Sequence, residues 1–504
     1  MAEDSRDELE PLTRRSSRQY IYNLERDSHN LLVLEDEHGF HRAPPREGAT
    51  VLQAVFNVVN IFIGMGMLSM PYAVMLGGWL SLGALVVAAA VFCVSGLLIV
   101  KNFDKVPAGM PHTYPALGVC VLGPSGRYVV GVSTVAEFFG ASCIMLVILW
   151  KEIETLMDDS GVLGMSVHHT AIIVGTLAIA PLLFIPSFKK LSWLSMAGCL
   201  STVLVTITVV AAVALDPKRD KMPTQPPAGH TLVKRGILEA FGIFAISVSG
   251  HTSLPVLRNS MKNPKDFNKV IYASFAAMAM VYGLVAGLGY YYFGDAASTL
   301  VTNDLAIDSP FTGHWLLVRG LTVDKVVVLC ILVNAYTTYP CLVLVIQDML
   351  WAVLAEADGL EIRAPKSWVA VATRLLICGA GAVVGYLTFD VLGNVMSLVG
   401  ALCAMNSSLL MPAAFFLVLF WRDLGALRRA GTATLLALGL ALLVMIVVQN
   451  VQSLIAQAHG SPTSDARGGG GGGGGSGGGG DLSACSGGWA LNGWMPSALL
   501  RQCI

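Results

Sequence analysis

The stretch Asn57-Val-Val-Asn-Ile-Phe-Ile-Gly-Met-Gly-Met-Leu-Ser-Met-Pro-Tyr-Ala73 lies in the first long apolar segment of the chain. Gly64 and Gly66 interrupt the middle of this segment, and Pro71 stands near its end. Lipid offers no hydrogen-bond partners, so interrupted backbone at membrane depth is tolerated only where it is buried in protein or lines a cavity. The stretch therefore predicts a broken membrane span that forms part of a binding site. Close packing of helices through small residues is the alternative explanation for the glycines.

The composition places the whole chain in a membrane. Of its 504 residues, 54% are hydrophobic and 13% are charged, against roughly 25% charged residues in soluble domains. We therefore predict an all-α polytopic membrane protein, and nothing in the net charge of −1 suggests a nucleic-acid partner. A crossing of the lipid bilayer needs about 20 apolar residues. By this criterion about eleven spans are predicted, at 50–73, 78–100, 128–150, 168–186, 191–215, 232–256, 270–293, 323–350, 368–389, 392–420 and 432–457.

The ends of the chain differ from this membrane domain, which we place at 49–458. Residues 1–48 hold seven basic and eleven acidic side chains and are predicted to form a disordered cytosolic tail. Residues 459–504 include a run of twelve glycines and one serine at 468–480, and they too are predicted to be disordered. A cytosolic N-terminus puts 21 Lys and Arg residues on the cytosolic side and 10 on the other, as the positive-inside rule expects.

A second interrupted span lies at 237–255. Ser247, Ser249 and Gly250 crowd its middle, and Pro255 follows. This span comes five spans after the first, and because five is odd, a second unit of five spans begins on the opposite side of the membrane. Two broken spans at matching places in such units are typical of an inverted repeat. We therefore expect a 5+5 arrangement of spans 1–10, with one extra helix outside it.

Two motifs carry a resemblance to a known family. The first helix of the amino acid/auxin permease family is similar to Asn57-x-x-Asn60-x-x-x-Gly64-x-Gly66-x-Leu68-x-x-Pro71-Tyr72-Ala73. The sixth helix and following loop of the vacuolar and vesicular branch resemble Ser249-Gly250-His251-x-x-x-Pro255 followed by Ser260-Met261-x-x-Pro264-x-x-Phe267. The likeness covers roughly residues 50–458 and does not include the glycine-rich tail.

This resemblance implies a leucine-transporter-type fold and a secondary active transporter of amino acids. In this branch it implies proton coupling and residence in a vacuolar or other acidic membrane, with the plasma membrane as the alternative. Some animal members use sodium instead, and a membrane sensor of amino acids with little flux is a further alternative. No nucleophile–base pair, metal-ligand cluster or P-loop stands out, so we expect neither an enzyme nor a metal or cofactor, and pumping would draw on an ion gradient.

We expect an amino acid, neutral in its side chain, to bind at the two breaks. The half-helix ends there present free N–H groups and a positive dipole to a carboxylate. The expected binding residues come from both broken spans and are Asn60, Gly64, Met65, Gly66, Ser247, Ser249 and Gly250.

Two ionisable residues inside spans are candidates for proton coupling. Glu137 lies about nine residues into its span, hence about 13 Å from the cytosolic face and close to the middle of a ~30 Å core. Burial favours the neutral form of a carboxyl group, which suits a proton carrier. The alternative is a carboxylate that caps a neighbouring helix break. His251 titrates in a suitable range; the alternative is a neutral histidine that bonds to the loosened backbone of its own span.

Four further polar residues lie inside predicted spans. The resemblance implies that Thr337 and Thr338 could help to bind a sodium ion against the first helix, whereas hydroxyls in spans commonly bond to their own backbone. Glu239 is expected to belong to an entry path or to reach water. Arg374 is expected to extend its side chain to the membrane interface.

Overall fold

The computed structural model describes most of the predicted membrane domain. The described residues are 49–63, 65–107, 113–157, 165–184, 197–198, 200–208, 210, 229–304, 316–318, 321–355 and 367–458. The chain divides into two units, residues 1–461 and 462–504, and all described residues belong to the first. The tails predicted to be disordered, at 1–48 and 459–504, lie outside the described residues.

Eight helical stretches of the described residues are long and apolar enough to cross a membrane. This confirms an all-helical polytopic membrane protein, while the number of about eleven spans stays a prediction. The long helices are α4 (Leu80–Asn102), α6 (Ser125–Leu156), α7 (Val167–Ile179) with η3 (Ala180–Phe184), α11 (Phe267–Phe293), α13 (Val323–Ala355), α14 (Ser367–Leu387), α17 (Ala426–Ala458), and a composite helix. The composite helix consists of α15 (Leu392–Val399), η8 (Gly400–Ala404), η9 (Asn406–Leu410) and α16 (Met411–Leu419).

Three predicted spans are not among these eight. The first, at 50–73, is broken as predicted, into α2 (Val51–Phe62), η1 (Met65–Ser69) and α3 (Met70–Gly77). Thr50 and Gln53 form a capping box at the start of α2, and Pro71 stands in the first turn of α3, where its missing N–H costs no hydrogen bond. The span predicted at 191–215 falls partly outside the described residues.

The span predicted at 232–256 is also broken. It consists of α9 (Ile237–Ser247), η4 (His251–Ser253) and α10 (Leu254–Asn259). Gly250 precedes η4 with φ 134°, a conformation that residues with a Cβ rarely adopt. The interruption predicted from the residues around Gly250 is therefore confirmed, and glycine is required there by the backbone.

The remaining elements are short. They are α5 (Tyr114–Leu122), α12 (Val301–Asp304), four single turns and one antiparallel pair of strands. The turns are η2 (Phe103–Lys105), η5 (Pro264–Asp266), η6 (Gly294–Ala296) and η7 (Phe389–Val391), and the strands are β1 (Leu316–Val318) and β2 (Leu321–Thr322).

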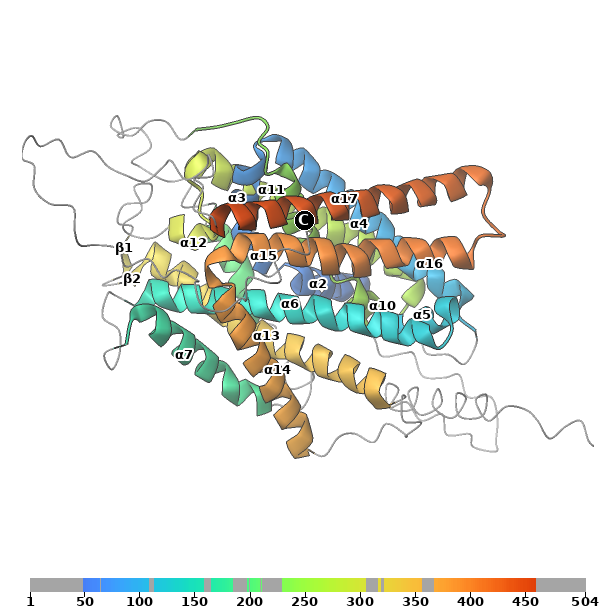
Figure 1. The fold of residues 1–504 in the computed structure, drawn as a ribbon, viewed down its shortest axis with the longest axis horizontal. Coiled ribbons are helices and arrows are strands. Elements are labelled where there is room, and N and C mark those ends of the chain that lie inside the picture. Colours follow the sequence, from blue (N-terminus) through green and yellow to red (C-terminus); the bar gives the residue numbers. More distant parts are fainter. Residues whose placement is uncertain are drawn as a thin grey trace, which may run out of the picture. The chain divides into compact units, whose positions relative to one another are not determined.

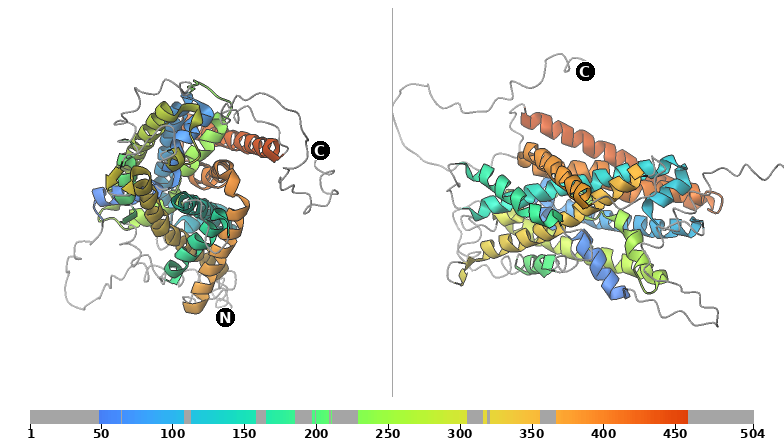
Figure 2. Two further views of the ribbon diagram at one scale, coloured as in Figure 1. Left: turned by 90° about the vertical axis from the view of Figure 1, so that its left-hand side faces the viewer. Right: turned by 90° about the horizontal axis from the view of Figure 1, so that it is seen from below.

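The two broken helices lie inside the bundle. Helix α11 packs against α2, α3 and α4, and α9 packs against α3 and α15. Helix α6 contacts α5, α7, α13 and α14. In Figure 1, α6, α16 and α17 run in a similar direction across the view, and α7 and α14 cross that direction at an angle. Figure 2 shows the helices from two further sides. The breaks are therefore enclosed by protein, as interrupted backbone in a membrane requires.

Helix α17 is attached to the bundle by polar contacts. Asn450 donates to Ser397 on α15 over 2.9 Å, and the hydroxyl of Ser453 donates to Glu239 on α9. Glu239 is only 8% exposed. The expectation that Glu239 reaches water is therefore wrong, because α17 covers its side chain.

The expectation for Arg374 is also wrong. Its side chain is 4% exposed and turns into the bundle rather than toward the interface. Its Nε donates to Gln347 on α13 over 2.7 Å, and its Nη1 donates to the carbonyl oxygen of Leu183 in η3 over 2.7 Å. A side-chain acceptor and an otherwise unpaired carbonyl at a helix end outweigh the benefit of hydration at the membrane surface.

Candidate functional site at the two helix breaks

The two breaks touch each other at Gly66 and Ser247. A Cβ atom placed on Gly66 would lie 2.1 Å from the Oγ atom and 2.5 Å from the Cβ atom of Ser247. Only a residue without a side chain fits at this contact. The glycine therefore lets the backbone of η1 lie directly against the end of α9. Gly66 and Ser247, two of the residues that we expected to bind substrate, are in contact there.

Carbonyl groups at both breaks share one donor. The hydroxyl of Tyr282, on α11, donates to the carbonyl oxygen of Phe62 over 2.8 Å and lies 3.1 Å from that of Ser247. These residues end α2 and α9, so their carbonyls lack partners within their own helices. Tyr282 is fully buried. It thus stabilises the two helix ends together, a role that the sequence pattern did not reveal.

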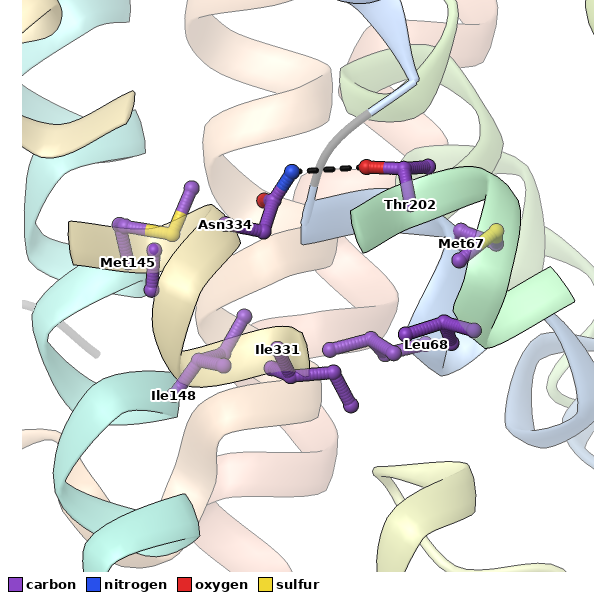
Figure 3. A pocket seen from close by; sticks show the side chains of 9 residues that line it. Met67, Leu68, Met145, Ile148, Thr202, Ile331 and Asn334 are labelled. Atoms are coloured by element: carbon purple, nitrogen blue, oxygen red, sulfur yellow. Dashed lines mark hydrogen bonds between the residues drawn. The ribbon is translucent and has the colours of Figure 1, made fainter. Parts of the chain in front are cut away.

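A small pocket, partly open to solvent, lies beside η1, and its volume of about 10 Å³ is roughly the space of one water molecule. Its walls come from η1, α6, α13 and residues 202–205, and they are mostly apolar: Met67, Leu68, Met145, Ile148, Thr202, Val205, Ile331, Asn334 and Ala335. Asn334 and Thr202 form its polar edge, where the Asn334 amide donates to the Thr202 hydroxyl over 2.7 Å (Figure 3). Among the described residues that line the pocket, none is Asp, Glu, Lys or Arg. Its surface suits an uncharged group.

Glu137 lies near the middle of α6, twelve residues or about 18 Å from the first residue of that helix. Its side chain is 3% exposed. One carboxylate oxygen accepts from the Ser407 hydroxyl over 2.7 Å, and the Ser249 hydroxyl at the break after α9 also interacts with it. The structure thus brings Glu137 to the second break, with its charge turned inward among hydroxyl groups.

Ser407 and Ser408 were missed by the analysis of the sequence. They lie in η9, one of two consecutive π-helical turns in the composite helix, and π-helical turns occur frequently at functional sites. Ser408 places its hydroxyl 3.5 Å from the amide nitrogen of Gly250. The signal was present as the polar run Asn406-Ser407-Ser408 inside an apolar span, but it carried no charge and no glycine.

His251 faces helix α4 rather than Glu137. Its Nε2 atom lies 2.8 Å from the carbonyl oxygen of Phe92. The ring is completely buried and is surrounded by the rings of Phe62, Phe92 and Phe275 at centroid distances of 5.6 to 6.1 Å. The histidine therefore bonds to backbone, which agrees with one of the two expectations. The backbone belongs to the neighbouring helix α4, however, and not to the histidine's own span.

Thr337 and Thr338 lie on α13, and Thr337 faces residue 198. The Thr337 hydroxyl donates to the carbonyl oxygen of Asn334 over 3.0 Å, and a Cβ atom on Gly198 would lie 2.5 Å from it. Thr338 is half-buried. Among the residues described here, no group of three or more His, Cys, Asp and Glu could hold a metal ion. Gly64 and the side chains of Asn60 and Met65 lie outside the described residues.

Two buried carboxyl groups, Asp304 of α12 and Glu152 of α6, bond to residues in or beside α12, the short helix that contacts η1, α3 and α13. Thr302 donates to Glu152 of α6 over 2.7 Å, and the backbone N–H of Ser298 donates to both oxygens of Asp304 over 3.0 Å. Burial raises the pKa of Asp304 to about 6, although the Ser298 bond acts in the opposite direction. Asp304 is therefore protonated in part under mildly acidic conditions.

Residues 47–453 match the family described as transmembrane amino acid transporter protein. This chain belongs to that family. The match covers both broken helices, Glu137, the π-helical turns and most of α17. The resemblance identified from the two sequence motifs is therefore confirmed for the family.

Similar proteins of this transporter family occur in plants and animals. The chain is 28% identical to amino acid transporter AVT1C of Arabidopsis thaliana over 421 residues, which cover 82% of this chain and 70% of that protein. It is 26% identical to AVT1I of the same plant over 409 residues, 79% of this chain and 92% of the relative. It is 25% identical to the vesicular inhibitory amino acid transporter of Xenopus tropicalis over 396 residues, 74% and 71% of the two chains.

Solved structures show the same fold in a transporter. Two structures of the Eremococcus coleocola manganese transporter, one of a mutant and one with an aromatic bis-isothiourea substituted compound, superpose with TM-scores of 0.50 and 0.51. Each comparison covers 86% of this chain and 93% of the other, at 13% and 12% sequence identity. At this identity, the likeness extends to the fold of this amino acid transporter family member and not to its substrate.

Proposed function

We propose that this protein is a secondary active transporter that moves neutral amino acids across the membrane of a vacuole or another acidic compartment, driven by a proton gradient. The observation that carries the proposal is Glu137, a buried carboxylate at the middle of a long helix, joined by hydroxyls to the break in the sixth span. A buried ionisable group in a membrane is costly and is usually functional. Membership of the family supplies the amino-acid substrate.

In this proposal the substrate binds between the breaks, beside the small apolar pocket. Backbone groups at Gly66 and Gly250, with the hydroxyls of Ser247 and Ser249, hold its carboxylate and amino groups. Asn60, Gly64 and Met65 complete the proposed binding set on the first span. The uncharged walls around Met67 and Met145 support a neutral side chain. Opening of the breaks to one side and then to the other gives alternating access.

Glu137 is the proposed coupling group, ahead of His251. A coupling group must bind a proton on the acidic side and lose it on the other. Glu137 has hydroxyl partners that serve the ionised carboxylate as donors and the protonated carboxyl as acceptors. His251 already has a fixed role, since its ring bonds to Phe92 and packs among phenylalanines.

The similarity to a vesicular transporter supports the proposed location, and the proposed proton coupling is consistent with it. An acidic lumen supplies protons that leave through the transporter. Their movement would drive substrate either in the same direction or, by exchange, in the opposite direction. The positive-inside rule supports a cytosolic N-terminus. Confinement of a fluorescently tagged protein to the plasma membrane would contradict this location.

Reconstitution tests the function directly. The purified protein in lipid vesicles with an imposed pH gradient is offered a panel of labelled amino acids. We expect accumulation of neutral amino acids that collapses when the gradient is dissipated. Glu137→Gln removes the titratable proton and keeps the size of the side chain, so it should abolish accumulation and retain exchange at equal pH. Normal accumulation by Glu137→Gln would show that the carboxylate is structural.

Sodium coupling is the second candidate, favoured by oxygen atoms gathered between α13 and residues 198–202. The Thr337 hydroxyl lies against Gly198, and Asn334 bonds both the Gly198 carbonyl, over 3.1 Å, and Thr202. Thr338 follows on the same helix. Replacement of external sodium by potassium distinguishes the two candidates, because only a sodium-coupled protein loses uptake in potassium while a pH gradient is maintained.

A further inference from the structure

The π-helical turn η9 (Asn406–Leu410) contacts four other elements through two adjacent serines. The hydroxyl of Ser407 donates to Glu137 on α6, and the hydroxyl of Ser408 lies 3.5 Å from the amide nitrogen of Gly250 at the break. The two hydroxyl oxygens are 3.5 Å apart. Both serines are fully buried. A chain of hydroxyl groups therefore leads from the carboxylate to the backbone of the broken helix.

The backbone of the same turn is held from the other side. The carbonyl oxygen of Ser407 accepts from the Tyr114 hydroxyl of α5 over 2.6 Å, and that of Ser408 accepts from the Ser95 hydroxyl of α4 over 2.6 Å. A π-helical turn loosens the regular hydrogen-bond ladder of a helix, which makes these carbonyls available to side-chain donors. The turn is thus fixed through its carbonyls, while its hydroxyls remain able to rotate.

Few titratable groups surround the Glu137 carboxylate. From α5 the phenol of Tyr114 interacts with it electrostatically, and from η8 the thiol of Cys403 does so. From η4 the imidazole of His251 is turned to α4. Cys143 of α6 lies almost two turns further along that helix, with Tyr339 of α13. Within the described residues, two hydroxyl groups bond to Glu137 from other elements: that of Ser407 in η9, over 2.7 Å, and that of Ser249 at the break itself.

We propose that Ser407 and Ser408 are positioning residues that transmit the protonation state of Glu137 to the break in the sixth span. The inference rests on the proposed function, because it assumes that Glu137 carries the coupled proton. It adds a specific connection: the proton acts on the break at Gly250 through η9, and not by direct contact of the proton with substrate.

The connection works by reversal of hydrogen bonds. When Glu137 is ionised, its carboxylate accepts from Ser407, whose only hydrogen is then engaged. When Glu137 is protonated, its carboxyl O–H donates to the Ser407 oxygen, which releases the serine hydrogen. That hydrogen turns toward Ser408 or toward the Ala404 carbonyl, 3.4 Å away. A hydroxyl has one donor and two acceptor sites, so the change alters what Ser408 offers to the Gly250 N–H.

The test compares pH profiles of substrate exchange in reconstituted vesicles, with both sides at equal pH. Ser407→Ala removes the donor that stabilises ionised Glu137, so the midpoint of the profile should move to higher pH by about one pH unit. Ser407→Thr retains the hydroxyl and should restore the original midpoint. Glu137→Gln should make exchange independent of pH. Adding Ser407→Ala to Glu137→Gln should then leave the pH profile of exchange unchanged.

Ser142→Ala is the matched control. Ser142 is a buried serine of the same helix as Glu137, and its hydroxyl donates to the Phe139 carbonyl, so its removal should leave the midpoint unchanged. If Ser407→Ala is too unstable to assay, Ser407→Cys, a weaker donor of similar size, should shift the midpoint in the same direction. An unchanged midpoint in Ser407→Ala, or in Ser407→Cys where alanine is too unstable, together with a flat profile for Glu137→Gln, overturns the inference alone. A normal profile for Glu137→Gln overturns the proposed function instead.

Discussion

Replacement of Gly66 by alanine tests the contact on which the site is built. In the structure, the new methyl group would lie 2.1 Å from the Ser247 Oγ atom and 2.5 Å from its Cβ atom. Non-bonded carbon atoms prefer separations of about 3.5–4.0 Å. The two breaks must therefore move apart by about 1 Å, or the chain must distort locally. Overpacking of this kind costs about 1–3 kcal/mol, and it falls where we propose that substrate binds.

A second substitution isolates that contact. Ser247→Gly removes both clashing atoms, after which the nearest atom of residue 247 to the new methyl is its Cα, at 3.0 Å. On its own, Ser247→Gly costs about 1 kcal/mol because glycine weakens the last turn of α9. In the double variant with Gly66→Ala, the free energy of unfolding should be about 1–2 kcal/mol higher than the sum of the two single effects predicts. A coupling energy of this size is typical of residues in contact.

The measurement is thermal unfolding of the purified variants in detergent, together with uptake by the same preparations in vesicles. Gly83→Ala on α4 is the control, because no atom lies within 4 Å of a Cβ placed there; it should be neutral or stabilising by up to about 1 kcal/mol. Strict additivity of Gly66→Ala and Ser247→Gly would refute the close approach of the two breaks.

Two further predictions concern buried charged groups outside the breaks. Folding raises the pKa of Asp304 from 3.8 to about 6. The free energy of unfolding should therefore be highest below pH 4 and should fall by up to about 3 kcal/mol as the pH rises through 6. Asp304→Asn should therefore flatten the dependence of the melting temperature on pH between 4 and 7, and an unchanged slope would contradict this. Arg374→Met should destabilise the protein by about 2–4 kcal/mol, because Gln347 and the Leu183 carbonyl lose buried donors; a loss below about 0.5 kcal/mol would instead fit a side chain at the membrane surface.

The sequence was sufficient to predict both broken helices and the buried carboxylate. Gly66 and Gly250 act through backbone conformation and close approach, which are local properties that composition and spacing reveal. Glu137 stands out because a carboxylate in an apolar span is rare. These features need no knowledge of which helices are neighbours.

Features that depend on distant neighbours could not be predicted in this way. Ser407 and Glu137 are 270 residues apart in the chain, and a neutral serine in an apolar span usually bonds to its own helix. Arg374 bonds to a carbonyl 191 residues away, so snorkelling was the reasonable expectation without a partner in view. Tyr282 was overlooked for the same reason: its phenol matters only because α2 and α9 end beside it.

The contacts at the two breaks differ in how they respond to a proton. Tyr282 holds the carbonyls of Phe62 and Ser247, and a phenol remains a donor at every physiological pH. In the mechanism that we propose, the Ser407 hydroxyl reverses its direction of donation with the charge of Glu137, and the adjacent Ser408 hydroxyl faces the amide nitrogen of Gly250. In that mechanism a proton acts first on the break in the sixth span. Because Gly66 leaves no space against Ser247, we propose that displacement of that break displaces η1 as well, so that a single carboxylate governs both halves of the proposed binding site.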